Sequence, residues 1–130
     1  MDWDSLVASA WQARERAYAP YSNFAVGAAL LAADGTIFSG CNVENISYGL
    51  TNCAERVAIG AAVAAGIRSF QAVAVVADTG VPISPCGACR QVLAEFSVNM
   101  PVCSANLQGE RFESTVSELL PRAKAGILGT

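Results

Sequence analysis

The spacing of apolar residues changes along the chain and predicts where helices and strands alternate. Near the start, one helical face carries Trp3, Val7, Trp11 and Tyr18. This spacing predicts an amphipathic helix over residues 3 to about 18, with Asp2 as its N-cap. We expect this helix to form a packing layer of the core.

Short apolar runs between turn residues predict the strands, and alanine-rich or cysteine-opened segments predict the later helices. The strands are expected at residues 24–32, 36–42, 70–77, 101–105 and 111–113, and the helices at residues 53–65, 86–96 and 115–120. The triplet Ala33-Asp34-Gly35 is a hairpin signal between the first two strands. The tail, residues 122–130, holds two glycines and is expected to be flexible.

The order of these elements predicts one domain over residues 1–130, of the α/β class. We expect a three-layer α-β-α fold with a central mixed five-stranded sheet and right-handed crossovers in its middle part. The helix at residues 53–65 is apolar on nearly all sides. It should therefore be buried inside the domain or at a subunit contact.

Composition and charge narrow the range of partners. The net charge is −3 and the chain has no run of lysine or arginine, so we expect a small molecule rather than a nucleic-acid polymer. Apolar residues make up 53% and charged residues only 15%, which favours an oligomer, although an alanine-rich core would also raise the apolar count.

The cellular location is predicted from two patterns, a membrane-spanning run and a signal peptide. No apolar run is long enough to span a bilayer, so no membrane partner is expected. The acidic start, Met1-Asp2-Trp3-Asp4, does not have the order of a signal peptide. We expect a cytoplasmic protein whose five cysteines are reduced thiols or metal ligands.

Three cysteines lie at the predicted starts of two helices. Cys53 opens one helix, and Cys86 and Cys89 lie one turn apart at the start of another. Thiolates bind zinc, and a helix N-terminus favours negative charge. We expect the three sulfurs to hold one Zn²⁺ per chain and to leave its fourth position open, as in catalytic zinc sites.

Other interpretations of these cysteines stay open at this point. The three thiols could be inert core residues, Cys86 and Cys89 could form a redox-active pair, or the metal could belong to a non-catalytic zinc module. Cys41 and Cys103 lie inside predicted strands without partner spacing, and we expect them in the core.

Charged residues beside these cysteines indicate hydrolytic chemistry. Glu55 could accept a proton from metal-activated water and return it to a substrate, which fits deamination of an amino-heterocycle. Its alternative role is that of a first-turn carboxylate favoured by the helix dipole. Arg56 could offset an anionic thiolate site by donating to a sulfur, unless it is a surface arginine. Arg90 is a weaker candidate for that role.

Residues 42–52 form a polar loop that leads directly into Cys53. Polar side chains follow one another here, at Asn42, Glu44, Asn45, Ser47, Tyr48, Thr51 and Asn52. Substrate recognition and plain solvated surface are equally good interpretations of such a loop.

Several motifs together resemble one enzyme family. Cys53-Ala54-Glu55 and Pro85-Cys86-Gly87-Ala88-Cys89 match the three-cysteine form of the zinc deaminase signature. The stretches around them, at residues 21–30, 40–49, 89–93 and 118–121, resemble the small free-nucleoside cytidine deaminases. The resemblance runs from about Ala17 to Pro121.

The resemblance implies zinc-dependent hydrolytic deamination of cytidine and deoxycytidine to uridine and deoxyuridine, in pyrimidine salvage. It implies a homotetramer whose active sites are completed by neighbouring subunits, with Tyr48 at a subunit contact near a site. It also implies substrate contacts from Phe24 on the pyrimidine ring, Asn42 and Glu44 on the ribose hydroxyls, the Ala54 N–H on the base carbonyl, and the Ser84 carbonyl on the leaving amino group.

The chain departs from the family at Lys124. After a Leu-Leu-Pro motif the family commonly carries an aromatic that reaches a neighbour's pyrimidine, and this chain has Arg122-Ala123-Lys124 there. Lysine cannot supply a ring stack. An alternative substrate, another aminopyrimidine nucleoside such as a nucleoside antibiotic, is therefore kept beside cytidine.

Overall fold

The computed structural model describes residues 2–130 and contains one five-stranded sheet with helices on both faces. The strands are β1 (Val26–Ala32), β2 (Ile37–Cys41), β3 (Phe70–Ala77), β4 (Pro101–Ala105) and β5 (Arg111–Thr115). The helices are α1 (Trp3–Arg14), α2 (Ala54–Ala64), α3 (Gly87–Phe96), α4 (Val116–Leu119) and α5 (Ala125–Leu128), with a short 3-10 helix η1 (Tyr48–Leu50). Both the predicted α/β class and the mixed sheet are confirmed.

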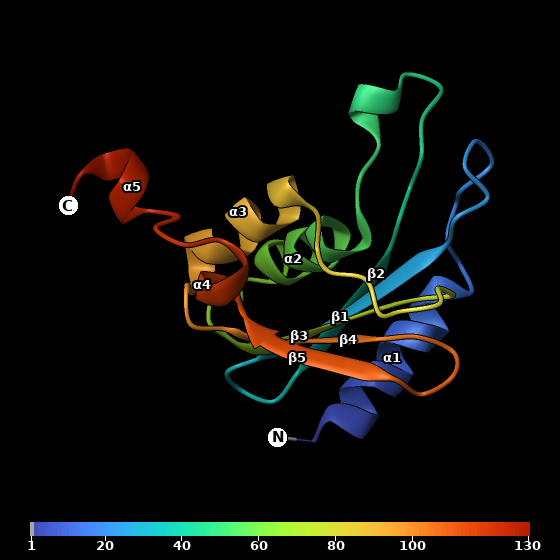
Figure 1. The fold of residues 1–130 in the computed structure, drawn as a ribbon, viewed down its shortest axis with the longest axis horizontal. Helices are drawn as coiled ribbons and strands as arrows, with labels where there is room; N and C mark the ends of the chain where they lie inside the picture. The colour runs from blue at the N-terminus through green and yellow to red at the C-terminus, as the bar shows by residue number, and fades with distance from the viewer. Residues whose placement is uncertain (1) are drawn as a thin grey trace.

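The layers follow from which side chains each helix buries. Helix α1 covers one face of the sheet, and α2 and α3 cover the other (Figure 1). Leu6, Val7 and Ala10 of α1 pack against small and β-branched residues of β1, β3 and β4. On the opposite face, Ile59 of α2 and Leu93 of α3 belong to a second buried cluster. The predicted three-layer α-β-α arrangement is therefore correct.

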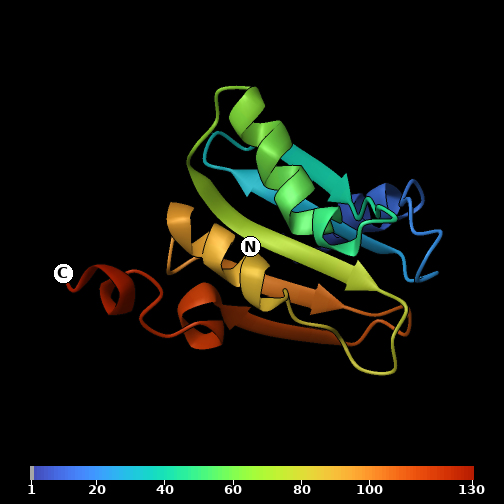
Figure 2. The same cartoon turned by 90° about the horizontal axis from the view of Figure 1, so that it is seen from above.

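Strand directions place the starts of α2 and α3 at the same edge of the sheet. The strand order is β2-β1-β3-β4-β5, and β1 is antiparallel to both β2 and β3. Strands β2 and β3 therefore run in the same direction, and α2 follows the end of one as α3 follows the end of the other. The two helices run along the same face of the sheet (Figure 2). Ligand sites form at this edge of parallel strands in α/β proteins.

A close approach of backbone holds α2 on β2. A Cβ atom added at Gly40 would lie 2.6 Å from both the carbonyl oxygen of Ala54 and the amide nitrogen of Ala58. Only glycine leaves room for that contact. Because Ala54 begins α2, this contact fixes the position of the helix end that carries Cys53 and Glu55.

The first helix is shorter than predicted. Helix α1 ends at Arg14, whereas the apolar spacing predicts a helix to about residue 18. Tyr18 instead pairs with the polar loop: its N–H donates to the Asn42 carbonyl at 3.0 Å, and its carbonyl accepts from the Glu44 N–H at 2.9 Å. This bridge requires extended backbone at Tyr18. The predicted N-cap is correct, since the Asp2 carboxylate accepts from the Ser5 N–H at 3.3 Å.

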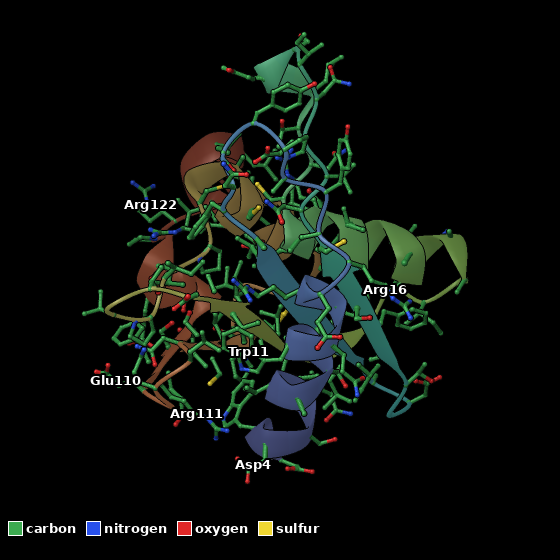
Figure 3. The ribbon with its side chains drawn as sticks, turned by 90° about the vertical axis from the view of Figure 1, so that its right-hand side faces the viewer. Asp4, Trp11, Arg16, Glu110, Arg111 and Arg122 are labelled. Atoms are coloured by element: carbon green, nitrogen blue, oxygen red, sulfur yellow. The ribbon has the colours of Figure 1, made fainter. Side chains whose placement is uncertain are left out.

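The last strand is longer than predicted and is tied to α1. Arg111 of β5 lies 2.7 Å from the Asp4 carboxylate, and both are labelled at the same end of α1 in Figure 3. The Trp3 indole N–H donates to Glu113 at 2.9 Å. Because both partners of the ion pair are at the surface, the tie orients the edge strand more than it stabilises the fold.

The C-terminal segment is more regular than predicted. Thr115 caps α4, and its side-chain hydroxyl oxygen accepts from the Glu118 N–H at 3.3 Å. The stretch predicted to be flexible contains the short helix α5, which projects from the body of the domain (Figure 1), and Ala123 before it is buried. Over residues 2–130, no helix is both long enough and apolar enough to cross a membrane.

Candidate metal centre and substrate pocket

Two of the three candidate ligands are N-cap residues. Cys53 caps α2 and Cys86 caps α3, and neither sulfur accepts a backbone N–H as a capping serine or aspartate would. Cys89 lies in the first turn of α3 and is fully buried. The sulfurs therefore remain available to a metal, at helix ends whose partial positive charge favours thiolates.

The sulfur positions fit zinc. The three Sγ atoms lie within 4.8 Å of one another, and those of Cys53 and Cys86 are 3.8 Å apart. A tetrahedral zinc with Zn–S distances of about 2.3 Å requires sulfur–sulfur separations of about 3.8 Å. The cluster thus has the donor type of a three-thiolate zinc site, and its sulfurs lie close enough together to share one ion.

Hydrogen bonds favour ionisation of the cluster at Cys53. Bonding from the Cys89 thiol, together with Arg56, lowers the pKa of Cys53 to about 5. The same hydrogen bond between the two thiols, together with burial, raises the pKa of Cys89. The Arg56 guanidinium donates to the Cys53 sulfur at 3.4 Å and to the Thr51 carbonyl at 3.4 Å. The predicted contact between Arg56 and a ligand sulfur is therefore present.

Glu55 is a buried carboxylate at the edge of a pocket. Its side chain is only 4% exposed, and burial raises the pKa of its carboxyl group. It nevertheless lines a pocket of about 310 Å³ together with Cys53 and Cys86. A carboxyl group with a raised pKa beside a metal site is suited to accepting and returning a proton.

Four of the predicted substrate-contacting residues line this same pocket, namely Phe24, Asn42, Ala54 and Ser84. The sequence interpretation missed Val26, Thr51 and Ile83, which also line it. Thr51 belongs to the polar loop, so composition gave a signal for it. Val26 and Ile83 are ordinary apolar residues, and nothing in their type distinguishes a pocket wall from a core position.

Glu44 and Tyr48 lie outside the metal-side pocket. They line a neighbouring hollow of about 340 Å³ with Tyr21 and Ser22, and Thr51 borders both cavities. The Glu44 carboxylate accepts from the N–H groups of Tyr21 and Ser22 at 2.9 and 3.1 Å and from the Ser22 hydroxyl. Glu44 therefore holds the loop that leads to Phe24.

The Asn42 side chain connects the start of the polar loop to the start of β1. Its side-chain oxygen accepts from the Val26 N–H at 2.9 Å, and its side-chain nitrogen donates to the Phe24 carbonyl at 2.8 Å. An amide has one further donor hydrogen and one further lone pair. The residue can therefore keep Phe24 in place and still present polar groups to the pocket.

The remaining candidates lie away from the pocket. The Arg90 guanidinium donates to the carbonyls of Pro85 and Leu119, at 2.7 and 2.8 Å, so its predicted role as a donor to sulfur is not supported. Cys103 is buried in the core as predicted. The same prediction is wrong for Cys41, which is only half-buried because it lies on the edge strand β2. Lys124 donates to the Glu95 carbonyl at 2.9 Å, on the far end of α3.

Comparison with known proteins identifies relatives over nearly the whole chain. Residues 1–105 match the model of the cytidine and deoxycytidylate deaminase zinc-binding region. A cytidine deaminase of Sporosarcina psychrophila is 61% identical over 124 residues, which cover 95% of this chain and 91% of the relative. One of Halalkalibacterium halodurans is 58% identical over 124 residues, covering 95% and 94%.

Solved structures agree with the sequence relatives. The cytidine deaminase of Burkholderia pseudomallei superposes with a TM-score of 0.91 at 54% identity, covering 93% of this chain and 98% of that one. The enzyme of Mycobacterium tuberculosis gives a TM-score of 0.83 at 42% identity, covering 95% and 98%. These matches favour the metal interpretation of the cysteines over a thiol redox pair or inert thiols. The chain belongs to the family of cytidine and deoxycytidylate deaminases that share this zinc-binding region.

Proposed function

We propose that this chain is a zinc-dependent cytidine deaminase, which hydrolyses cytidine and deoxycytidine to uridine and deoxyuridine with release of ammonia, a step of pyrimidine salvage. The observation that carries the proposal is the buried Glu55 carboxylate beside three sulfurs that lie close enough together to share one ion. Family membership adds the substrate class, since the relatives are named cytidine deaminases.

Cys53, Cys86 and Cys89 would hold the metal, one ion per chain. Zinc in such a site supplies a water molecule that is nucleophilic at neutral pH. Glu55 takes a proton from the attacking water and delivers it to the ring nitrogen beside the amine-bearing carbon. The water oxygen becomes the new carbonyl oxygen of the base, and the amino group leaves as ammonia after gaining the second proton.

Backbone groups and one aromatic side chain would orient the base. The N–H of Ala54 lies in the first turn of α2, where helix N–H groups have no intrahelical partner, so it can donate to the base carbonyl. The Ser84 carbonyl is a suitable acceptor for the leaving amino group. Phe24, which is 40% exposed and lines the pocket, offers a ring face to the pyrimidine.

Arg56 would balance the charge of the site. Three thiolates exceed the charge of one zinc ion, which makes the metal a weaker Lewis acid. Donation from Arg56 to the Cys53 sulfur withdraws negative charge from that ligand. The N-termini of α2 and α3 act in the same direction.

Asn42 and Glu44 would recognise the sugar. Both belong to the loop of residues 42–52, which lines the metal-side pocket and the neighbouring hollow, and together they supply an amide and a carboxylate for a diol. A site built to bind a hydroxyl group discriminates strongly against an analogue without it, because its polar groups are then left unpaired.

The chain would act as a homotetramer whose subunits complete one another's sites. The loop of residues 42–52 rises above α2 (Figure 1) and carries three large apolar side chains in solvent: Ile46 at 77% exposure, Tyr48 at 75% and Leu50 at 66%. Apolar side chains so exposed on a loop beside a pocket favour a subunit contact.

Sedimentation equilibrium tests the assembly. We expect a single species with four times the chain mass. The Tyr48→Ala tetramer should be weaker, so that it already dissociates at protein concentrations where the wild type is still a tetramer. A monomer at every protein concentration would contradict the proposal.

Metal removal tests the chemistry. We expect one zinc per chain, complete loss of cytidine turnover after chelation, and recovery when zinc is added, followed by the ultraviolet change on conversion to uridine. Cys86→Ser should lose the metal, whereas the control Cys41→Ser should retain it because Cys41 lies outside the cluster. Full turnover by the stripped protein would refute a zinc mechanism.

A substrate that lacks the 2′ and 3′ hydroxyls distinguishes two roles of Glu44, namely recognition of the sugar and support of the loop. The wild type should prefer cytidine strongly over 2′,3′-dideoxycytidine in kcat/KM. Glu44→Ala should reduce that preference by roughly tenfold or more, because the hydroxyl contact is lost. If Glu44 only holds residues 21–23, both substrates will lose the same factor and the preference will stay unchanged.

A further inference from the structure

The segment after β5 is held along α3 by hydrogen bonds from three side chains. Arg90 donates to the Leu119 carbonyl at 2.8 Å, and Gln91 donates to the Ala123 carbonyl at 3.1 Å. Lys124 returns from the tail to the Glu95 carbonyl at 2.9 Å. Of these three side chains, Arg90 also contacts the turn that carries the metal-site cysteines.

Arg90 contacts the peptide groups on both sides of Cys86. Its guanidinium Nε donates to the Pro85 carbonyl at 2.7 Å, and its own backbone N–H donates to the Cys86 carbonyl at 2.9 Å. The Pro85 carbonyl belongs to the peptide that ends at the Cys86 nitrogen. The backbone bond is the first regular bond of α3 and does not depend on the side chain at position 90. The Arg90 guanidinium itself therefore holds the peptide plane that precedes Cys86, which helps to set where the Cys86 sulfur points.

The position of Arg90 is unfavourable for a cation unless these contacts compensate. It lies in the second half of the first turn of α3, and positive charge near a helix N-terminus is disfavoured by the dipole. Helical side chains point toward the N-terminus of their helix, so the Arg90 side chain extends back toward Pro85. Its planar fork can then donate from separate nitrogens to the Pro85 and Leu119 carbonyls.

The contact to Leu119 connects the cysteine turn to α4. Leu119 is the last residue of α4, whose final carbonyls have no intrahelical partner. Helix α4 is itself fixed: Val116 is buried, its N–H donates to the Met100 carbonyl at 3.0 Å, and the Ser117 N–H donates to the Val98 carbonyl at 2.7 Å. Arg90 thus links the cysteine turn to an anchored helix.

We propose that Arg90 is a positioning residue for the metal centre, which sets the geometry of the Cys86 ligand by bridging the Pro85 and Leu119 carbonyls. The inference rests on the proposed zinc site and assigns Arg90 a role distinct from charge balance at the sulfurs. It also makes α4 a structural support of the metal site, although none of the α4 residues lines the pocket.

The test compares Arg90→Ala and Arg90→Lys with Gln91→Ala in the full chain. Gln91 is the matched control, since it also joins α3 to the C-terminal segment but does not contact the cysteine turn. Zinc affinity is measured by competition with a chromophoric chelator. Cobalt-substituted protein is measured in parallel, because its sulfur-to-cobalt and visible bands report ligand geometry independently of activity.

We expect Arg90→Ala to bind zinc about 10- to 100-fold more weakly and to show shifted cobalt bands, the usual range when a supporting contact of a metal ligand is lost. Arg90→Lys, which keeps the charge but has one nitrogen for two carbonyls, should also bind zinc more weakly than the wild type. Gln91→Ala should keep the wild-type affinity and spectrum. If Arg90→Ala does not fold, the lysine variant decides by the same readouts.

Wild-type zinc affinity and cobalt bands in the Arg90 variants would overturn the positioning role while leaving the proposed function intact. An equal loss of affinity in Gln91→Ala would also overturn it, because docking of the C-terminal segment would then be the cause. Absence of zinc binding by the wild type would refute both proposals.

Discussion

The meeting of two helix N-termini at one edge of the sheet is the constraint on which the site depends. It arises because β2 and β3 run in the same direction on either side of β1, so that α2 and α3 both start where those strands end. The close contact at Gly40 then sets the depth of α2 on the sheet. Without these two features, Cys53 could not approach Cys86, which is 33 residues further along the chain.

Electrostatics explains why the same few residues recur around this junction. A cluster of thiolates is stable only where positive charge compensates it, and the helix N-termini and Arg56 provide that charge. Glu55 experiences the opposite balance: burial raises the pKa of its carboxyl group beside a negatively charged cluster. Neighbouring residues of one helix turn are therefore tuned in opposite directions, which is what a proton carrier beside a metal site requires.

Sequence prediction succeeds where residue type and spacing define an arrangement, and fails where a contact depends on packing across the fold. Cysteines at two helix starts predict that Cys53, Cys86 and Cys89 lie together, and their sulfur atoms do cluster, with Glu55 lining the pocket beside them. The end of α1 was misplaced because the bridge from Tyr18 to the polar loop is a long-range pairing that overrides helical periodicity. The contacts of Arg90 depend on where α4 packs, which no local pattern contains.

The central claim is that Glu55 moves the proton in a reaction that needs the metal, and that Glu55 is not itself a metal ligand. The most direct test is to measure zinc content and cytidine turnover together in the wild type, in Glu55→Gln and in the surface control Glu15→Gln. The account predicts one zinc per chain in all three, wild-type turnover in Glu15→Gln, and a loss of roughly 100-fold or more in Glu55→Gln, the scale of acid–base catalysis. Unchanged turnover in zinc-loaded Glu55→Gln would contradict it.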